Sequence, residues 1–394
     1  MPVVHLDLPA APSRNVPRVP ARAAGPLELG FLTPHDVGNP AAFSGTPHFA
    51  ARALRRNPKI RLRVLTDPPR HALNRLLRRP SDTADISPAD FNGLDAVVGL
   101  VATCLAPRVP AGLPFLHVTD ATPSFLHETY GWELPEGAFA AERRTAQRAS
   151  RVIYSSAAMA ARAAADLGLP GLRPDILPFG VNFTDPPSER PLKPPLSAPR
   201  LLFVGRDWTR KGGDIAIGAL AHLHERGIAA TLDIVGPCPD SVKGIDGVRA
   251  HGFVDRRRWW GAQKLAGLYR RAHLLVLPTR GDCTPMVIAE AMAHAMPVVV
   301  TDIGGVSEVI GGEGAGLTLP STAGASDWAA AIAGLMARPM AWEMMSDAAF
   351  DRARSRMSWD VWAAEIADFA HTDRMLHKMR HESRRHTGEA AKAG

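Results

Sequence analysis

The chain has little cysteine and no long apolar run. Its three cysteines, Cys104, Cys238 and Cys283, are far apart and odd in number, so they form neither a disulfide framework nor a metal-ligand spacing, and a reducing cytoplasm fits them best. Apolar runs such as 274–277 and 297–300 are far shorter than the about 20 residues that a membrane-spanning helix needs. Since no basic region followed by an apolar stretch opens the chain, we expect no signal peptide and a cytoplasmic protein.

Patterns that bind phosphate or metal are missing as well. The chain has no Gly-x4-Gly-Lys-Ser/Thr loop and no Asp-x-Asp sequence, so nothing local indicates a metal-held diphosphate. His35 and His48 have no metal-ligand partner at a recognisable spacing, and we expect no metal site. The net charge of +7 favours anionic partners, but no nucleic-acid motif is recognisable, so nucleotides, phosphates and anionic lipids are the partners that fit best.

Length and composition predict the domain organisation. A chain of 394 residues favours two domains, because one domain usually takes about 100–200 residues. Residues 1–26 have the Pro-, Ala- and Arg-rich composition of a poorly ordered leader, and the prolines between 184 and 199 predict a semi-rigid linker. We therefore expect α/β domains over 27–183 and 200–357, a helix over 358–370 and a basic tail over 371–394 that is frayed or disordered.

Short apolar runs alternate with helical patterns in both regions, which predicts a parallel sheet in each. In the first region the expected strands are 27–32, 63–66, 95–101, 115–118 and 151–155, with helices at 46–56 and 138–149 among them. In the second region they are 201–205, 231–236, 273–278 and 297–302, with a helix over about 285–295.

Residues 277–305 hold a pair of acids, Asp282 and Glu290, at the end of an expected strand. Open α/β sheets bind ligands at that edge. Thr284 as the N-cap and Pro285 at the first helical position make a plausible helix start, whose free N–H groups suit a phosphate. Glu290 in the second turn suits a pair of ribose hydroxyls, and Asp282 before the helix is placed to reach the sugar. The alternative, two solvated surface acids, explains neither the turn chemistry nor the strand that follows.

A second basic loop follows the strand that ends at Gly205. Arg206 and Lys211 precede Gly212 and Gly213, and two cations on one loop at a strand end suit a diphosphate. They would stabilise negative charge as the nucleotide leaves. Taken alone, a solvated basic turn is an equal alternative.

The order of these segments resembles family 4 glycosyltransferases, which are retaining enzymes of the GT-B fold. The resemblance covers about residues 27–370 and is stronger in the second half. It lies in Gly205-Arg206, Lys211-Gly212, 232–236, 251–253, Asp282, Glu290-Ala-Met-Ala and 297–299, and more weakly in Ser44-Gly45-Thr46-Pro47 and 177–182.

The resemblance implies two Rossmann-like domains facing across a cleft, with the acceptor on the first and a nucleotide-diphosphate sugar, as substrate and without a separate cofactor, on the second. It places Arg206 and Lys211 on the donor diphosphate, Glu290 on the ribose and Asp282 near the sugar, and it gives Gly45 a close approach of backbone to the diphosphate or acceptor. Gly205, Thr284, Met286 and Val287 complete the expected donor-binding set. The last helix, 358–370, is expected to return to the first domain.

Three positions depart from the family pattern. The acid near the sugar is usually Glu rather than Asp282, and the next residues are usually Gly-Phe-Gly rather than Cys283-Thr284-Pro285, where Pro285 has no N–H to offer. Where many relatives carry a His facing the reacting sugar, the best match here is Asp120, with His117 three residues earlier. Asp120 is equally suited to catalysis and to capping the next turn.

Two basic clusters have a surface as their simplest interpretation, and an anionic membrane surface as the sharper one. They are Arg52, Arg55, Arg56, Arg61 and Arg63 with Arg75, Arg78 and Arg79 nearby, and Arg256, Arg257 and Arg258 before Trp259 and Trp260. The whole pattern predicts a glycosyltransferase of the hexosyltransferase type with an unidentified acceptor. A nucleotide-sugar-binding GT-B protein without turnover, a phosphorylase and a sugar-nucleotide epimerase are the alternatives.

Overall fold

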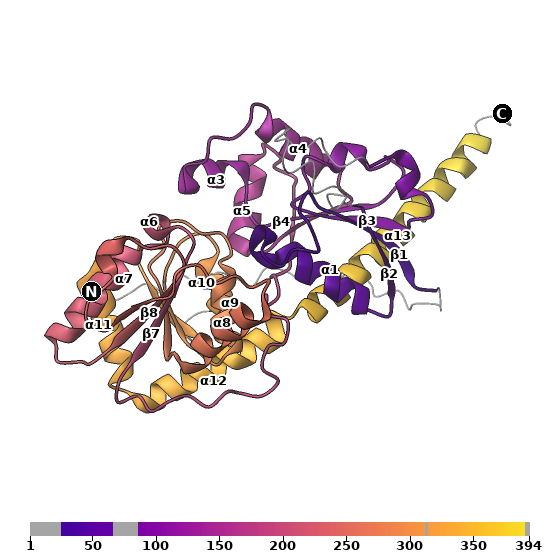
Figure 1. Cartoon of the computed structure of the whole chain (residues 1–394). Helices are drawn as coiled ribbons and strands as arrows, with labels where there is room; N and C mark the ends of the chain where they lie inside the picture. The colour runs from indigo at the N-terminus through magenta and orange to yellow at the C-terminus, as the bar shows by residue number, and fades with distance from the viewer. Residues whose placement is uncertain (1–24, 66–85, 312–313, 391–394) are drawn as a thin grey trace, which may run out of the picture.

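The computed structural model describes residues 25–65, 86–311 and 314–390 (Figure 1). Most of the expected leader and the three arginines Arg75, Arg78 and Arg79 lie outside the described residues. The chain forms two lobes, and each contains one sheet with helices packed on it (Figure 1). All strand pairings among the described residues are parallel.

The first sheet has the strand order β2-β1-β3-β4-β5-β6. Its strands are β1 (Leu27–Leu32), β2 (Ile60–Val64), β3 (Ala96–Leu100), β4 (Phe115–Thr119), β5 (Arg151–Tyr154) and β6 (Asp175–Ile176). The helices of this lobe are α1 (Thr46–Arg56), α3 (Pro123–Tyr130), α4 (Ala138–Arg148) and α5 (Ala157–Asp166). The expected strand at 63–66 lies at 60–64 instead, because this edge strand alternates buried apolar and exposed Arg residues rather than forming an apolar run.

The second sheet has the strand order β12-β11-β10-β7-β8-β9. Its strands are β7 (Arg200–Val204), β8 (Thr231–Val235), β9 (Val248–Ala250), β10 (Leu274–Leu277), β11 (Val298–Thr301) and β12 (Gly316–Leu319). The accompanying helices are α6 (Trp208–Lys211), α7 (Gly213–Glu225), α8 (Trp259–Arg271), α9 (Met286–Ala293), α10 (Val306–Ile310), α11 (Ala325–Met336) and α12 (Pro339–Arg356). The β7, β8, β10 and β11 strands agree with the sequence prediction to within a residue or two.

The start of α9 corrects one prediction. The helix begins at Met286, with Pro285 as its N-cap and without a side-chain cap, so Thr284 is neither the cap nor part of the helix. The Thr284 hydroxyl instead lies 2.7 Å from the Ser155 hydroxyl of the first lobe. A long-range partner has therefore replaced the local cap.

The last helix, α13 (Trp359–Ala390), is much longer than the predicted one and includes most of the expected basic tail. It crosses from the second lobe and runs back along the first (Figure 1). Trp362, Ile366 and Ala370 are fully buried in the core of the first lobe. Beyond them, Asp373 pairs with Arg151 at 3.0 Å and Arg374 pairs with Asp95 at 3.0 Å. Ion pairs thus carry the helix past the apolar stripe on which the prediction rested.

Candidate functional site

A cavity of about 550 Å³ lies between the two lobes, at the carboxyl ends of the strands. It is lined by Asp120 from the first lobe and by Arg206, Lys211, Asp282 and Glu290 from the second. Residues separated by up to 170 positions in the sequence are therefore brought to one site, at the sheet edge where α/β folds bind ligands.

Lys211 and Asp282 form an ion pair at the second-lobe side of this cavity. Lys211 ends α6, and the following Gly212 has a φ of +75°, where a Cβ would lie 1.9 Å from the Pro278 carbonyl oxygen. Only glycine allows this approach. Asp282 also accepts a hydrogen bond from Thr279 Oγ1 at 3.1 Å, and its side chain is nearly buried. The predicted cation and the predicted acid therefore hold each other in place.

Arg206, in contrast, is exposed and has its guanidinium 5.5 Å from the centre of the Phe253 ring. Gly205 beside it donates its N–H to the Val235 carbonyl at 3.0 Å, so that N–H is not available to a ligand. A Cβ on Gly205 would lie 2.9 Å from Lys211 Cγ. Gly205 thus leaves room for the Lys211 side chain.

Glu290 is buried in α9 with both carboxylate oxygens bonded. Arg256 donates to one at 2.7 Å and Tyr269 Oη to the other at 2.9 Å. Burial raises the pKa of Glu290, although Arg256 and Tyr269 oppose that effect. Met286 and Val287, at the start of the same helix, line the cavity. The first N–H groups of a helix have no partner within it, so this end of α9 can face a phosphate.

Arg256 corrects the interpretation of the 256–258 cluster as a solvated basic face. Its guanidinium bonds Glu290 and the Asn182 carbonyl, the latter at 2.5 Å, whereas Arg257 is exposed and pairs with Asp255. Arg256 and Tyr269 are site residues that the sequence did not reveal. Their partners are 34 and 21 positions away, with no local motif to connect them.

Asp120 follows β4 and faces the cavity from the first lobe. Burial is the main cause that raises the pKa of Asp120 to about 6, with a further contribution from the negative charge of Asp282. His117 points elsewhere, since it is fully buried and its Nε2 lies 2.8 Å from Glu142 Oε1. Asp120, not His117, is the titratable group that β4 presents to the cavity.

Three strained residues line the same first-lobe wall. Among the described residues other than glycine, φ is positive at Phe43, Ser44, Val101 and Ala295, and the first three line the cavity. A positive φ is unfavourable for a β-branched residue such as Val101, and such strain tends to persist at functional sites. Gly45, with a φ of +95°, is not itself in the lining, although its neighbours Ser44 and Thr46 are.

The two lobes also touch directly beside the cavity. The Arg210 guanidinium lies 4.5 Å from the Tyr130 ring centre, and Cys283 N donates to Tyr130 Oη at 3.2 Å. The Glu308 carboxylate accepts from the Ala157 and Ala158 N–H groups at the start of α5, at 2.5 and 2.6 Å. Tyr130, Arg210 and Glu308 were not predicted, because each acts through a partner in the other lobe.

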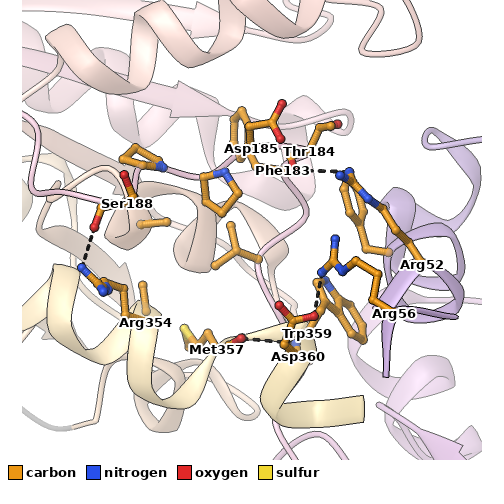
Figure 2. Close-up of a pocket in the computed structure, with 17 residues that line it drawn as sticks. Arg52, Arg56, Phe183, Thr184, Asp185, Ser188, Arg354, Met357, Trp359 and Asp360 are labelled. Carbon is orange, nitrogen blue, oxygen red and sulfur yellow. Dashed lines mark hydrogen bonds and ion pairs between the residues drawn. The ribbon is translucent and has the colours of Figure 1, made fainter. Parts of the chain in front are cut away.

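A second cavity, of about 480 Å³, lies where the chain crosses between the lobes (Figure 2). Arg52 donates to the Thr184 carbonyl at 3.2 Å, Arg56 pairs with Asp360 at 2.6 Å and Arg354 donates to the Ser188 carbonyl at 2.6 Å (Figure 2). In β2, Arg61 pairs with Glu28 and Arg63 donates to the Asp90 and Asn92 carbonyls. Four of the five arginines of the expected basic cluster thus have partners within the chain and serve the fold.

Two negative findings concern the described part of the chain alone. Within it, no helix combines the length and the apolar content needed to cross a bilayer. Nor do three or more His, Cys, Asp or Glu side chains gather there in a way that could hold a metal ion.

Comparison with known proteins gives this arrangement a family context. Residues 198–338 match the family described as glycosyl transferases group 1. D-inositol 3-phosphate glycosyltransferase of Segniliparus rotundus is 32% identical over 168 residues, which are 41% of this chain and 37% of that protein. Glycogen synthase of Mycobacterium tuberculosis is 31% identical over 180 residues, 44% of this chain and 43% of that protein. The matches span less than half the length of these relatives.

Solved structures share the fold over most of the chain. Sucrose-phosphate synthase from Thermosynechococcus elongatus superposes with a TM-score of 0.63 at 19% identity, covering 88% of this chain and 98% of that one. Anabaena HepE in complex with UDP and glucose superposes with a TM-score of 0.59 at 16% identity, covering 88% and 100%. The GT-B fold, two Rossmann-like domains facing across a cleft, is confirmed.

The resemblance to family 4 is confirmed as well. Residues 198–338, which carry Arg206, Lys211, Asp282 and Glu290, belong to the glycosyl transferases group 1.

Proposed function

We propose that this chain transfers a sugar from a nucleotide-diphosphate donor to an acceptor bound by the first lobe, with retention of anomeric configuration. The observation that carries the proposal is the meeting of Arg206, Lys211 and Glu290 with Asp120 in one cavity. Membership of residues 198–338 in the glycosyl transferases group 1 supports it. HepE, of the same fold, was solved with UDP and glucose, which favours a uridine donor as the first to test.

In this proposal the donor lies on the second lobe. Arg206, exposed and without a carboxylate partner among the described residues, takes the diphosphate together with Lys211 and the N–H groups at the start of α9. Glu290 accepts from the ribose hydroxyls, oriented by Arg256 and Tyr269. These groups stabilise the negative charge that develops on the leaving diphosphate.

The chemistry needs no protein nucleophile. The bond between the anomeric carbon and the phosphate oxygen breaks, and the acceptor oxygen bonds to that carbon on the same face. The acceptor proton passes to the leaving phosphate oxygen. Asp282 keeps Lys211 on the departing charge, and Asp120 accepts a hydrogen bond from a hydroxyl near the reacting carbon.

One observation favours a second candidate, a nucleotide-sugar-binding protein without turnover. Pro285, at the N-cap of α9, removes an N–H from the place where the donor phosphate would lie. A binder would keep Arg206 and Glu290 and dispense with precise geometry around Asp282. Phosphorylase and epimerase activities are excluded or established by the same product analysis.

The test has two stages. Thermal unfolding with UDP, GDP, ADP and their sugars first identifies the nucleotide, since a ligand at about 100 times its Kd adds about 2.7 kcal/mol of stability. Release of nucleoside diphosphate from the matching nucleotide sugar then separates an enzyme from a binder. If no nucleotide raises the midpoint, the donor site is wrongly assigned.

Association with an anionic membrane surface is a further proposal, now carried by the exposed Trp259 and Trp260 beside Arg257 and Arg258 rather than by the Arg52–Arg63 cluster. Exposed aromatic and basic side chains together suit a lipid interface. Co-sedimentation with acidic vesicles at low salt should show binding that weakens as salt rises. Absence of binding at low salt would rule it out.

A further inference from the structure

Charge is unevenly distributed across the cavity between the lobes. Its described cations, Arg206, Arg210, Lys211 and Arg256, all come from the second lobe. Among the described residues of the first lobe, Asp120 is the one charged side chain in the lining. A donor diphosphate has its cations on one side, and the acceptor side presents a carboxylate.

The acceptor side also carries aromatic rings. Tyr130 and Trp132 form an edge-to-face pair with ring centres 5.2 Å apart, and Phe43 lines the same wall. Trp132 keeps 52% of its surface exposed, which is unusual for so large an apolar side chain. An aromatic face packs well against the C–H face of a saturated ring, while the polar edges of Tyr and Trp tolerate water.

The backbone holds these groups under strain. Phe43 and Val101 have φ values of 44° and 51°, which are unfavourable for residues with a side chain. The surrounding contacts must over-determine such conformations for them to persist. The wall therefore has a defined shape and is not a loose surface.

From the carboxylate, the rings and the segregated charge, we infer that the acceptor is an uncharged ring bearing hydroxyl groups, a sugar or cyclitol, and that a phosphorylated acceptor is selected against. One hydroxyl donates to Asp120, and the ring face packs on Trp132 and Tyr130. A phosphate on the same ring would meet the charges of Asp120 and Asp282 without a described cation on its own side. The inference rests on the proposed function and adds the acceptor class to it.

The experiment compares matched ligands. Methyl glucoside and myo-inositol are titrated beside glucose 6-phosphate and inositol 3-phosphate by calorimetry, with the nucleoside diphosphate identified above held at saturation. We expect the neutral rings to bind at least about tenfold more tightly than the phosphates. Asp120→Asn should narrow that ratio at least about threefold by improving phosphate binding. Trp132→Ala should weaken the neutral rings at least about fivefold.

Controls separate this inference from the donor site. Phe139→Ala, an exposed aromatic that is not in the described cavity lining, should leave every affinity unchanged. Nucleotide affinity is measured alone in each variant. Tighter binding of the phosphates by the parent, an unchanged ratio in Asp120→Asn, or no binding of any ring at about 50 mM while the nucleotide binds, overturns the inference alone. Failure of the nucleotide to bind overturns the proposed function instead.

Discussion

Asn182 and Trp359 are joined by a hydrogen bond of 2.9 Å, from the indole Nε1 to the amide Oδ1, at the point where the chain crosses between the lobes. The Asn182 amide nitrogen donates in turn to the Ser44 carbonyl at 2.9 Å, and its own carbonyl accepts from Arg256. One fully buried asparagine thus connects the strained 43–46 loop, the start of α13 and, through Arg256, Glu290.

This connection predicts a strong effect of Asn182→Ala. The change leaves the Trp359 N–H and the Ser44 carbonyl without partners, and each buried unsatisfied group costs about 1–3 kcal/mol. We expect the free energy of unfolding in urea to fall by about 2–4 kcal/mol. Asn57→Ala, which removes one exposed bond to Lys59 N, is the matched control and should cost under about 1 kcal/mol. Equal effects of the two changes would show that Asn182 does not connect these elements.

Arg206 and Lys211 should differ in stability while agreeing in function. Replacing either by Ala is expected to weaken binding of the nucleoside diphosphate by about 1.5–3 kcal/mol, the size of a lost charge-assisted contact. Lys211→Ala also leaves the buried Asp282 without its partner, so it should lower the melting temperature, whereas Arg206→Ala should not.

Calorimetry and thermal unfolding measure the two quantities separately. Arg249→Ala, an exposed arginine of β9 that does not line the cavity, is the control for charge alone. Unchanged nucleotide affinity in both Arg206→Ala and Lys211→Ala would remove these residues from the donor site.

Glu290→Gln should alter donor affinity more than turnover. An acid that holds the ribose does so equally in the ground state and in the transition state, and such an interaction acts on KM. The amide keeps an oxygen for Tyr269 but loses the charge that pairs with Arg256. We expect the donor KM to rise by about tenfold with kcat within about threefold of the parent. A selective loss of kcat would place Glu290 at the reacting centre instead.

The pH dependence of stability tests the environment of Asp120. Its folded pKa of about 6 lies above the ordinary carboxyl value of 3.8, so the folded state holds this proton to higher pH than the unfolded state does. The protonated carboxyl therefore adds stability below about pH 4, and that contribution is lost as the pH rises to about 6. The difference in unfolding free energy between the parent and Asp120→Asn should change by about 2–3 kcal/mol across this window. Parallel profiles would show an ordinary, solvated carboxyl.

The fold could be predicted from the sequence because buried parallel strands are apolar runs and the helices between them recur with helical spacing. The acid pair and the basic loop were visible because each lies just after such a strand. Short strands such as β6, with two residues, and β9, with three, give no pattern above background. The alternating edge strand β2 was misplaced because only continuous apolar runs had been sought.

The rest of the site depends on contacts that no local pattern encodes. Lys211 meets Asp282 across 71 positions, and Asn182 meets Ser44 across 138. The pairing of Arg256 with Glu290 could not be distinguished from a solvated charge, because Arg256, Arg257 and Arg258 are adjacent in the sequence and differ only in burial. Residues whose roles depend on a distant partner therefore became visible only in the folded chain.

The measurement that tests the central claim most directly is the release of nucleoside diphosphate from its nucleotide sugar by the parent and by Asp282→Asn, beside titration of the nucleotide alone. Asp282 positions Lys211 on the departing charge, and such a contact matters most in the transition state. The account predicts release by the parent, a rate lower by at least about tenfold in the variant, equal to about 1.4 kcal/mol, and similar nucleotide affinity in both. Tight nucleotide binding with no release by the parent, or equal release by the two proteins, would contradict it.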